Sequence, residues 1–195
     1  MTQIEDPRLT ATRDHALDSA MKILLNEGVV AVTHGSVSKA TGISRSTLYR
    51  HWPEIAQLRS SALKRASVPP IVTAETDGSL RADLTRTMAT LTSALNETVW
   101  GKVAPQVIAA ASIDPEIKDV INELMRERIK WVESIYTEAD ARGELRADAP
   151  VPELVQMAIA VPYFRKFIAG LPLDQKWLES HVDFLCRMAE VEQDK

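Results

Sequence analysis

The chain has 195 residues, 45% of them hydrophobic and 26% charged, with a formal net charge of −4. This composition is ordinary for a globular protein and excludes a disordered chain or a strongly basic protein that coats nucleic acid. The single cysteine, Cys186, excludes a disulfide within the chain, and no Cys/His spacing typical of a metal site occurs. Without a signal-peptide pattern or an apolar run of membrane-spanning length, we expect a soluble, cytoplasmic protein that does not contact a membrane.

Charge is unevenly divided along the chain. Residues 1–66 contain nine Lys or Arg and six Asp or Glu, a net charge of +3, whereas residues 67–195 carry −7. A mildly basic segment joined to an acidic one suits a protein in which only one module contacts phosphate groups.

The first helix is predicted to follow a loose polar arm over residues 1–9 and to begin at Thr10. Its apolar face is formed by Leu17, Ala20, Met21, Leu24 and Leu25, which recur with helical spacing. Gly28 is the expected C-terminal cap. The apolar run 29–32 that follows is interpreted as a connection, because no partner strand lies near it.

A helix-turn-helix is predicted next. Thr33 is an expected N-cap of a helix of about eight residues, Gly42 ends that helix, and Ser44 caps the following one. Ile43 lies between them as an apolar residue in the turn. In such a motif the second helix enters the DNA major groove and contacts bases with its N-terminal residues.

The candidate DNA-binding residues follow from this placement, each with an alternative. Arg45 lies one position past the turn, where a bidentate contact to guanine is geometrically natural, although a solvated helix face is the alternative. Packing within the small domain is the alternative for Tyr49. The predicted base and phosphate contacts of the second helix are Ser44, Arg45, Ser46, Thr47, Tyr49, Arg50 and His51.

Several further residues shape the N-terminal segment. Gly35 inside a helix costs about 1 kcal/mol relative to alanine, and it either lets the backbone approach DNA or is simply tolerated. Leu48 and Trp52 are expected to anchor the recognition helix. Pro53 fits the first turn of a fourth helix that ends near Ala66.

The remainder of the chain is predicted to be helical after a linker at 67–78, which contains two adjacent prolines. Five helices are expected there. The first has an apolar stripe formed by Leu80, Leu84, Met88, Leu91 and Leu95, and the second covers 99–111, although Pro105 could shift its start. The third runs from Asp114-Pro115 to Arg142-Gly143, the fourth covers 153–169 with a kink at Pro162, and the fifth covers 174–190, is capped by Asp174 and has the stripe Leu178, Val182, Leu185 and Met188.

The segment from Thr10 to Ala66 resembles the DNA-binding domain of the TetR/AcrR (tetracycline-repressor-like) family. The resemblance is carried by Gly42-Ile43-Ser44, Thr47-Leu48-Tyr49 and His51-Trp52. It implies phosphate contacts by Thr47, Tyr49 and His51, and by Thr33 at a helix N-terminus, where N–H groups favour anions. Ile55 stands where the family often has lysine, which implies the loss of about one counterion from the salt dependence of binding.

The C-terminal part resembles the ligand-binding domain of the same family. The stretches that carry this are Leu80-Arg81-Ala82-Asp83-Leu84, Asp114-Pro115-Glu116, Arg142-Gly143-Glu144-Leu145-Arg146 and Val161-Pro162-Tyr163-Phe164. Large side chains on these helices could line an apolar ligand pocket, although ordinary core packing is the alternative for each of them. The candidate pocket residues are Trp100, Met125, Arg128, Trp131, Tyr136, Met157, Tyr163 and Phe164.

The last two helices are too apolar to face water on two sides, which indicates a partner. By resemblance, helices 153–169 and 174–190 form a four-helix interface with a second copy of the chain, and the operator is roughly palindromic. Nothing in the sequence points to a cofactor, and no catalytic motif suggests an enzyme.

The predicted fold is therefore all-α with about nine helices: a helix-turn-helix domain over 10–66 and a larger ligand-binding and dimerisation domain over 79–195. The resemblance implies a homodimeric repressor that a small apolar molecule releases from double-stranded DNA. The alternatives are a DNA-binding regulator without a small-molecule ligand and, less favoured, a helical enzyme.

Overall fold

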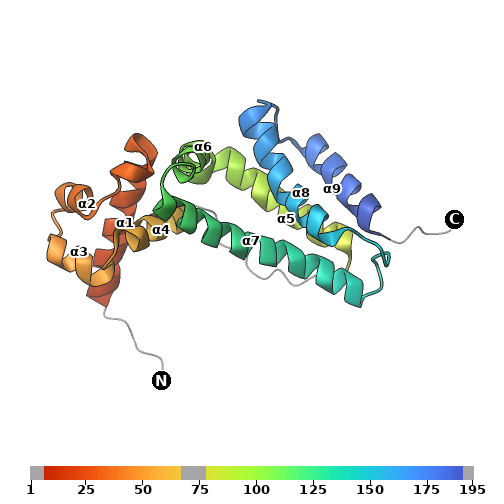
Figure 1. The fold of residues 1–195 in the computed structure, drawn as a ribbon, viewed down its shortest axis with the longest axis horizontal. Helices are drawn as coiled ribbons and strands as arrows, with labels where there is room; N and C mark the ends of the chain where they lie inside the picture. Colours follow the sequence, from red (N-terminus) through yellow and green to blue (C-terminus); the bar gives the residue numbers. More distant parts are fainter. Residues whose placement is uncertain (1–6, 67–77, 191–195) are drawn as a thin grey trace, which may run out of the picture. The chain divides into compact units, whose positions relative to one another are not determined.

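The structure is a computed structural model that describes residues 7–66 and 78–190. All regular elements in these residues are helical, apart from one isolated bridge between Leu145 and Glu190, which confirms the all-α prediction (Figure 1). The elements are α1 (Pro7–Glu27), the 3₁₀ turn η1 (Val29–Ala31), α2 (His34–Thr41), α3 (Arg45–His51), α4 (Ile55–Ala66), α5 (Leu80–Glu97), α6 (Val99–Ala111), α7 (Pro115–Ala141), α8 (Val151–Tyr163), the π-helical turn η2 (Phe164–Ile168) and α9 (Gln175–Ala189). None of the helices in the described ranges is both long enough and apolar enough to span a membrane.

The first compact unit contains α1 to α4 together with residues 99–124, which comprise α6 and the start of α7. Helix α1 packs against α2, α4 and α6, and α6 also contacts η1 and α4. Burial of apolar side chains between these helices stabilises the unit. Its most fully buried side chains include Leu24, Val37, Leu48, Leu58, Leu63, Trp100 and Val107.

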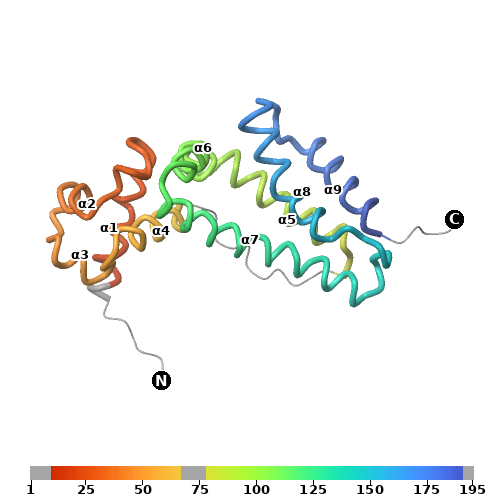
Figure 2. Tube along the Cα trace, in the orientation of Figure 1, coloured from red at the N-terminus to blue at the C-terminus, as the bar shows by residue number. Residues whose placement is uncertain are grey.

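The second compact unit contains α5, α7 beyond Leu124, α8, η2 and α9. Helix α5 packs against α8 and α9, and the three run alongside one another in the tube trace (Figure 2). The core is formed by Leu80, Leu84, Met88, Val132, Ile135, Tyr136, Leu154, Val155, Leu178, Val182, Leu185 and Cys186, among others. Burial raises the pKa of the Cys186 thiol to about 12, so this cysteine stays protonated at neutral pH.

The two compact units do not follow the segments 10–66 and 79–195. Residues 99–124 group with the N-terminal helices, and α6 contacts α1, η1 and α4. The division into a DNA-binding and a ligand-binding domain describes function, and it stays a prediction. Apart from Gly78, the predicted linker lies outside the described residues.

Three predicted details concerning prolines are corrected. Helix α1 begins at Pro7, not at Thr10, because proline is well tolerated in a first helical turn, where its missing N–H has no intrahelical partner. Pro53 precedes α4, because the carbonyl of Glu54 accepts the first bonds of that helix. Pro105 lies inside α6 and does not shift its start from Val99.

The end of α8 also differs from its prediction. Pro162 lies inside α8, which ends at Tyr163 and not at Ala169 as predicted. The chain continues from Phe164 as the π-helical turn η2, where the N–H of Ala169 donates to the carbonyl of Phe164 at 2.9 Å. Met188 is exposed, so the predicted stripe on α9 ends at Leu185.

His181 on α9 is a buried titratable side chain, 7% exposed, that stacks on Trp177 with ring centroids 4.9 Å apart. Burial lowers the pKa of its imidazole from 6.5 to about 4, although a hydrogen bond to the backbone of Met157 opposes the shift. The native state therefore holds the ring neutral over a range in which the unfolded chain is protonated.

We expect the free energy of unfolding to fall as the pH drops from about 6.5 towards 4, because in this range His181 is protonated in the unfolded state and neutral in the native state. The shift corresponds to roughly 3 kcal/mol below pH 4. Urea unfolding at several pH values, compared with His181→Gln, measures it. Carboxylates titrate equally in both proteins, so identical pH profiles would contradict the prediction.

Candidate nucleic-acid interface

The turn between α2 and α3 is built by local caps. The side chain of Thr33 accepts a hydrogen bond from the N–H of Ser36 at 3.0 Å. The hydroxyl oxygen of Ser36 in turn accepts a hydrogen bond from the N–H of Thr33 at 3.0 Å, which completes a capping box. Gly42 ends α2 with φ of 74°, a left-handed conformation that favours glycine. Ser44 caps α3 through the N–H of Thr47. The predicted caps Thr33, Gly42 and Ser44, the length of the first helix and the helix-turn-helix itself are confirmed.

Helix α3 has one buried face and one exposed face. Leu48 and Trp52 are buried as predicted, and the indole N–H of Trp52 donates to Ser61 Oγ of α4 at 2.9 Å. These contacts fix α3 against the rest of the unit. The side chains of Arg45, Tyr49 and Arg50 lie on the exposed face.

The basic side chains of this unit differ in whether the protein already binds them. Arg59 and Arg65 of α4 form ion pairs with acidic residues of the same unit. Arg45 and Arg50 of α3, in contrast, form no hydrogen bond or ion pair with any described residue. Their guanidinium donors are therefore available to an external acceptor, such as a base edge or a phosphate.

The three hydroxyl groups at the start of α3 form a local cluster. Ser44 Oγ lies 2.9 Å from both Ser46 Oγ and Thr47 Oγ1. Since Ser44 is occupied as the N-cap, Ser46 and Thr47 are the better placed of the three to contact DNA.

Tyr49 depends on a residue that sequence reasoning did not single out. Its ring, 50% exposed, stacks on His34 with centroids 4.1 Å apart. His34 is itself buried and its Nε2 lies 2.7 Å from the carbonyl oxygen of Trp52, so it joins the start of α2 to the end of α3. Because 15 residues separate His34 from Tyr49, no helical spacing or local motif indicates this contact.

Two further predicted phosphate contacts have different settings. At the N-terminus of α2 the N–H groups of His34 and Gly35 donate to no described residue, which suits an anion beside Thr33. The Nε2 atom of His51, in contrast, is buried without a hydrogen-bond partner among the described residues. Phosphate contact by His51 therefore requires Nδ1 or a rotation of the ring.

The candidate ligand-pocket residues divide between the two compact units. Trp100 lies in the core of the first unit, and the other seven lie in the second. Arg128 donates to the hydroxyl of Tyr163 at 2.7 Å, and both side chains are partly buried. Met125 and Trp131 are partly buried, whereas Met157 and Phe164 are exposed.

Tyr136 is the most enclosed of these candidates. Its side chain is fully buried, and its hydroxyl has no hydrogen-bond partner among the described residues. Burial raises the pKa of this hydroxyl, which therefore remains protonated. A buried hydroxyl without a partner costs about 1–3 kcal/mol, and a bound polar group would offset that cost.

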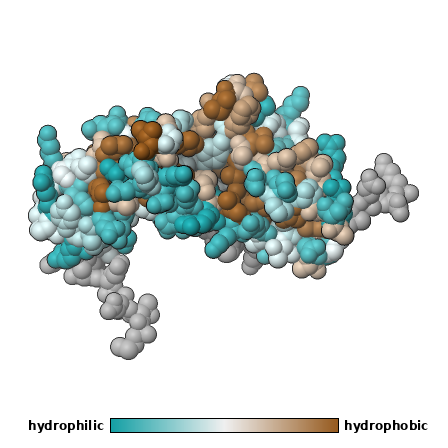
Figure 3. Space-filling view, in the orientation of Figure 1, coloured by the Kyte–Doolittle hydropathy of each residue, from teal (hydrophilic) through white to brown (hydrophobic). Residues whose placement is uncertain are grey.

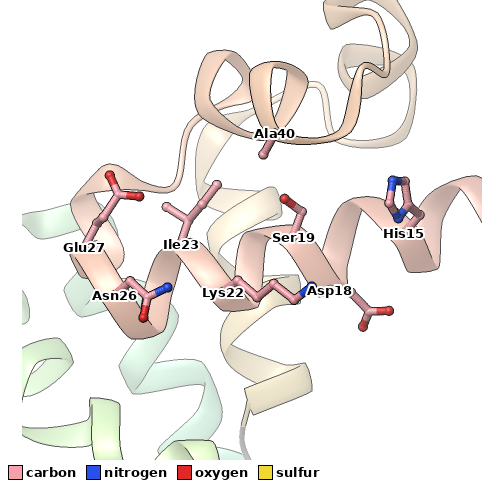
Figure 4. A pocket seen from close by; sticks show the side chains of 8 residues that line it. All are labelled: His15, Asp18, Ser19, Lys22, Ile23, Asn26, Glu27 and Ala40. Atoms are coloured by element: carbon pink, nitrogen blue, oxygen red, sulfur yellow. The ribbon is translucent and has the colours of Figure 1, made fainter.

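A pocket of about 240 Å³ lies elsewhere, between α1 and α2 of the first unit. Ser19 and Ile23 point from α1 towards Ala40 of α2 (Figure 4). The carboxylate of Asp18, which also lines it, is already bound by Arg65 at 2.7 Å. The remaining lining residues are His15, Lys22, Asn26 and Glu27. This pocket was not predicted.

Comparison with known proteins supports the sequence resemblance. A family model described as the tetracyclin repressor-like C-terminal domain matches residues 74–185. The chain is 28% identical over 177 residues to the DNA-binding transcriptional repressor TetR of Mycobacteroides abscessus, covering 88% of this chain and 90% of that protein. It is 26% identical over 190 residues to an uncharacterized HTH-type transcriptional regulator of Mycobacterium tuberculosis, covering 91% and 88%.

Solved structures share the fold. The TetR family transcription regulator SCO0332 has a TM-score of 0.66 and 25% identity, covering 90% of this chain and 97% of that chain. NalD, the secondary repressor of the MexAB-OprM multidrug efflux pump in Pseudomonas aeruginosa, has a TM-score of 0.72 and 17% identity, covering 94% and 99%.

Proposed function

The chain belongs to the tetracycline-repressor-like family of transcriptional regulators, and we propose that it is a repressor that binds a palindromic operator as a homodimer. In this proposal, a small apolar molecule bound by the C-terminal helices releases it from DNA. The observation that carries DNA recognition is the exposed face of α3, where the Arg45 and Arg50 guanidinium groups bind no described residue.

Homodimer formation is supported by exposed apolar side chains on α8, η2 and α9. Phe164 is 60% exposed and Ile168 74%, and Leu171, in the segment between η2 and α9, is 48% exposed. Figure 3 shows hydrophobic surface gathered over the end of α8 and over η2. Met157, Phe184 and Met188 are further exposed apolar residues on these helices. An apolar surface of this kind indicates a protein partner, and the surface of a second copy is the simplest one.

Release by a small molecule is supported by the unpartnered hydroxyl of Tyr136, which lies within a largely apolar core. The mechanism requires two states with different spacings of the recognition helices. The ligand must bind the two states with different affinities, and DNA then lowers ligand affinity by the same factor. A regulator without a ligand would show no shift in melting temperature with any effector.

Selection of bound duplexes from a random DNA pool tests DNA recognition. We expect the wild type to enrich an inverted repeat, because a symmetric dimer presents two copies of α3. Arg45→Ala should relax the preference at one base position in each half-site, by about fivefold or more. Tyr49→Ala should weaken binding to all sequences alike, because phosphate contacts carry no sequence information.

Arg65→Ala is the matched control, because Arg65 binds Asp14 and Asp18 of α1 and does not lie on α3. It should leave the selected sequence unchanged. Absence of any enriched repeat at low salt, after unfolding and refolding to remove a bound effector, would contradict the proposed function.

A further inference from the structure

Gly35, in the first turn of α2, lies against the guanidinium group of Arg45 on α3. A Cβ atom added to Gly35 would lie 3.2 Å from Nη2 and 3.7 Å from Cζ of Arg45. The first distance is shorter than an ordinary van der Waals contact. Even a methyl group at position 35 would therefore push the end of the Arg45 side chain aside by a few tenths of an ångström.

The backbone conformation does not require a glycine at this position. Gly28 and Gly42 have positive φ angles, which favour glycine, but Gly35 is not among the positive-φ residues. Alanine would also favour the helical state of α2. What distinguishes Gly35 is thus the space above it, which Arg45 fills.

We propose that Gly35 is a specificity-determining residue that acts through Arg45. Because Gly35 has no Cβ, the Arg45 guanidinium group packs against the first turn of α2, and this packing limits the orientations in which its N–H donors meet a base edge. Bidentate recognition needs the planar group in one orientation, and an arginine free to move loses conformational entropy when it binds. The inference rests on the DNA-binding function proposed above.

A double-mutant cycle tests this coupling. Binding of wild type, Gly35→Ala, Arg45→Ala and the double variant is measured on the selected operator and on operators changed at the base position that Arg45→Ala relaxes. Gly35→Ala should lower discrimination at this position by about fivefold or more. In the Arg45→Ala background, the same substitution should change discrimination by less than about twofold.

Arg50→Ala provides the matched background, because Arg50 is also exposed on α3 and is not among the atoms nearest Gly35. In the Arg50→Ala background, Gly35→Ala should lower discrimination by the same factor as it does in the otherwise wild-type protein. The thermal unfolding midpoint of Gly35→Ala should equal or exceed that of the wild type, because the displaced atoms are the flexible end of a side chain.

Each other result would overturn the inference. An unchanged base preference in Gly35→Ala would show that the orientation of Arg45 does not depend on position 35. An equal loss with and without Arg45 would show that Gly35 acts directly, through close approach of its backbone to DNA. A lower unfolding midpoint of Gly35→Ala in both backgrounds would show that a side chain at position 35 destabilises α2 itself. If the wild type selects no sequence, the proposed function fails first.

Discussion

Replacing Phe164 and Ile168 together by glutamate is expected to convert the proposed dimer into a monomer and to weaken operator binding by at least about 100-fold. Both side chains are more than half exposed in the single chain. In the proposed dimer they are buried against a second copy, where unpaired carboxylates are strongly disfavoured. Loss of the dimer removes simultaneous binding of two half-sites, which contributes about 10²- to 10⁴-fold to affinity.

Sedimentation or light scattering measures the oligomeric state, and a titration with the operator duplex measures affinity. Ile113→Glu is the matched control, because Ile113 is 85% exposed in the first compact unit and lies outside the proposed interface. It should leave both quantities unchanged. A double variant that remains dimeric would show that the two copies associate through another surface.

Arg59→Ala is expected to destabilise the protein by about 3 kcal/mol. The side chain of Arg59 is 10% exposed, and its guanidinium group donates to the carbonyl oxygens of Val32 and Val30 at 3.2 and 3.1 Å. It also lies 3.5 Å from Glu116 and 3.9 Å from Asp114 at the start of α7. Truncation would leave carbonyls of η1 and its C-cap without their donor, with two carboxylates nearby.

Urea unfolding of the two proteins measures the difference in free energy. Arg65→Ala, on the same helix, is the control, because its partners Asp14 and Asp18 are about half exposed. Water screens such surface pairs, so its loss should cost less than about 1 kcal/mol. Equal effects of the two substitutions would show that burial of Arg59 does not determine its contribution.

The helices and the recognition motif could be predicted because their signals are local. A cap such as Ser44 or Asp174 acts on an N–H three residues away, and Gly42 fixes the turn through its own φ angle. The exposed position of the recognition helix follows from the same local pattern. The positions of prolines relative to the helix boundaries were predicted less well, because a proline can lie before a helix, in the first turn of a helix or in the interior of a helix.

The tertiary structure decided which basic side chains remain available to DNA. Arg45 and Arg59 are equally basic in sequence, yet Arg59 is held by carbonyls 27 and 29 residues away, and Arg65 by carboxylates 47 and 51 residues away. No spacing along one helix contains such information. The contact of His34 with Tyr49 and the grouping of α6 with the N-terminal helices also join segments that are distant in the sequence, so local patterns do not predict them.

The sequence by itself thus determined the all-helical class and the helix-turn-helix, and it predicted the face of α3 that is proposed to contact DNA, since each depends on residues within a few positions of one another. The tertiary structure alone placed Arg45 above Gly35. That contact joins two helices across a turn, and it depends on the angle at which they pack, which periodicity and caps do not specify.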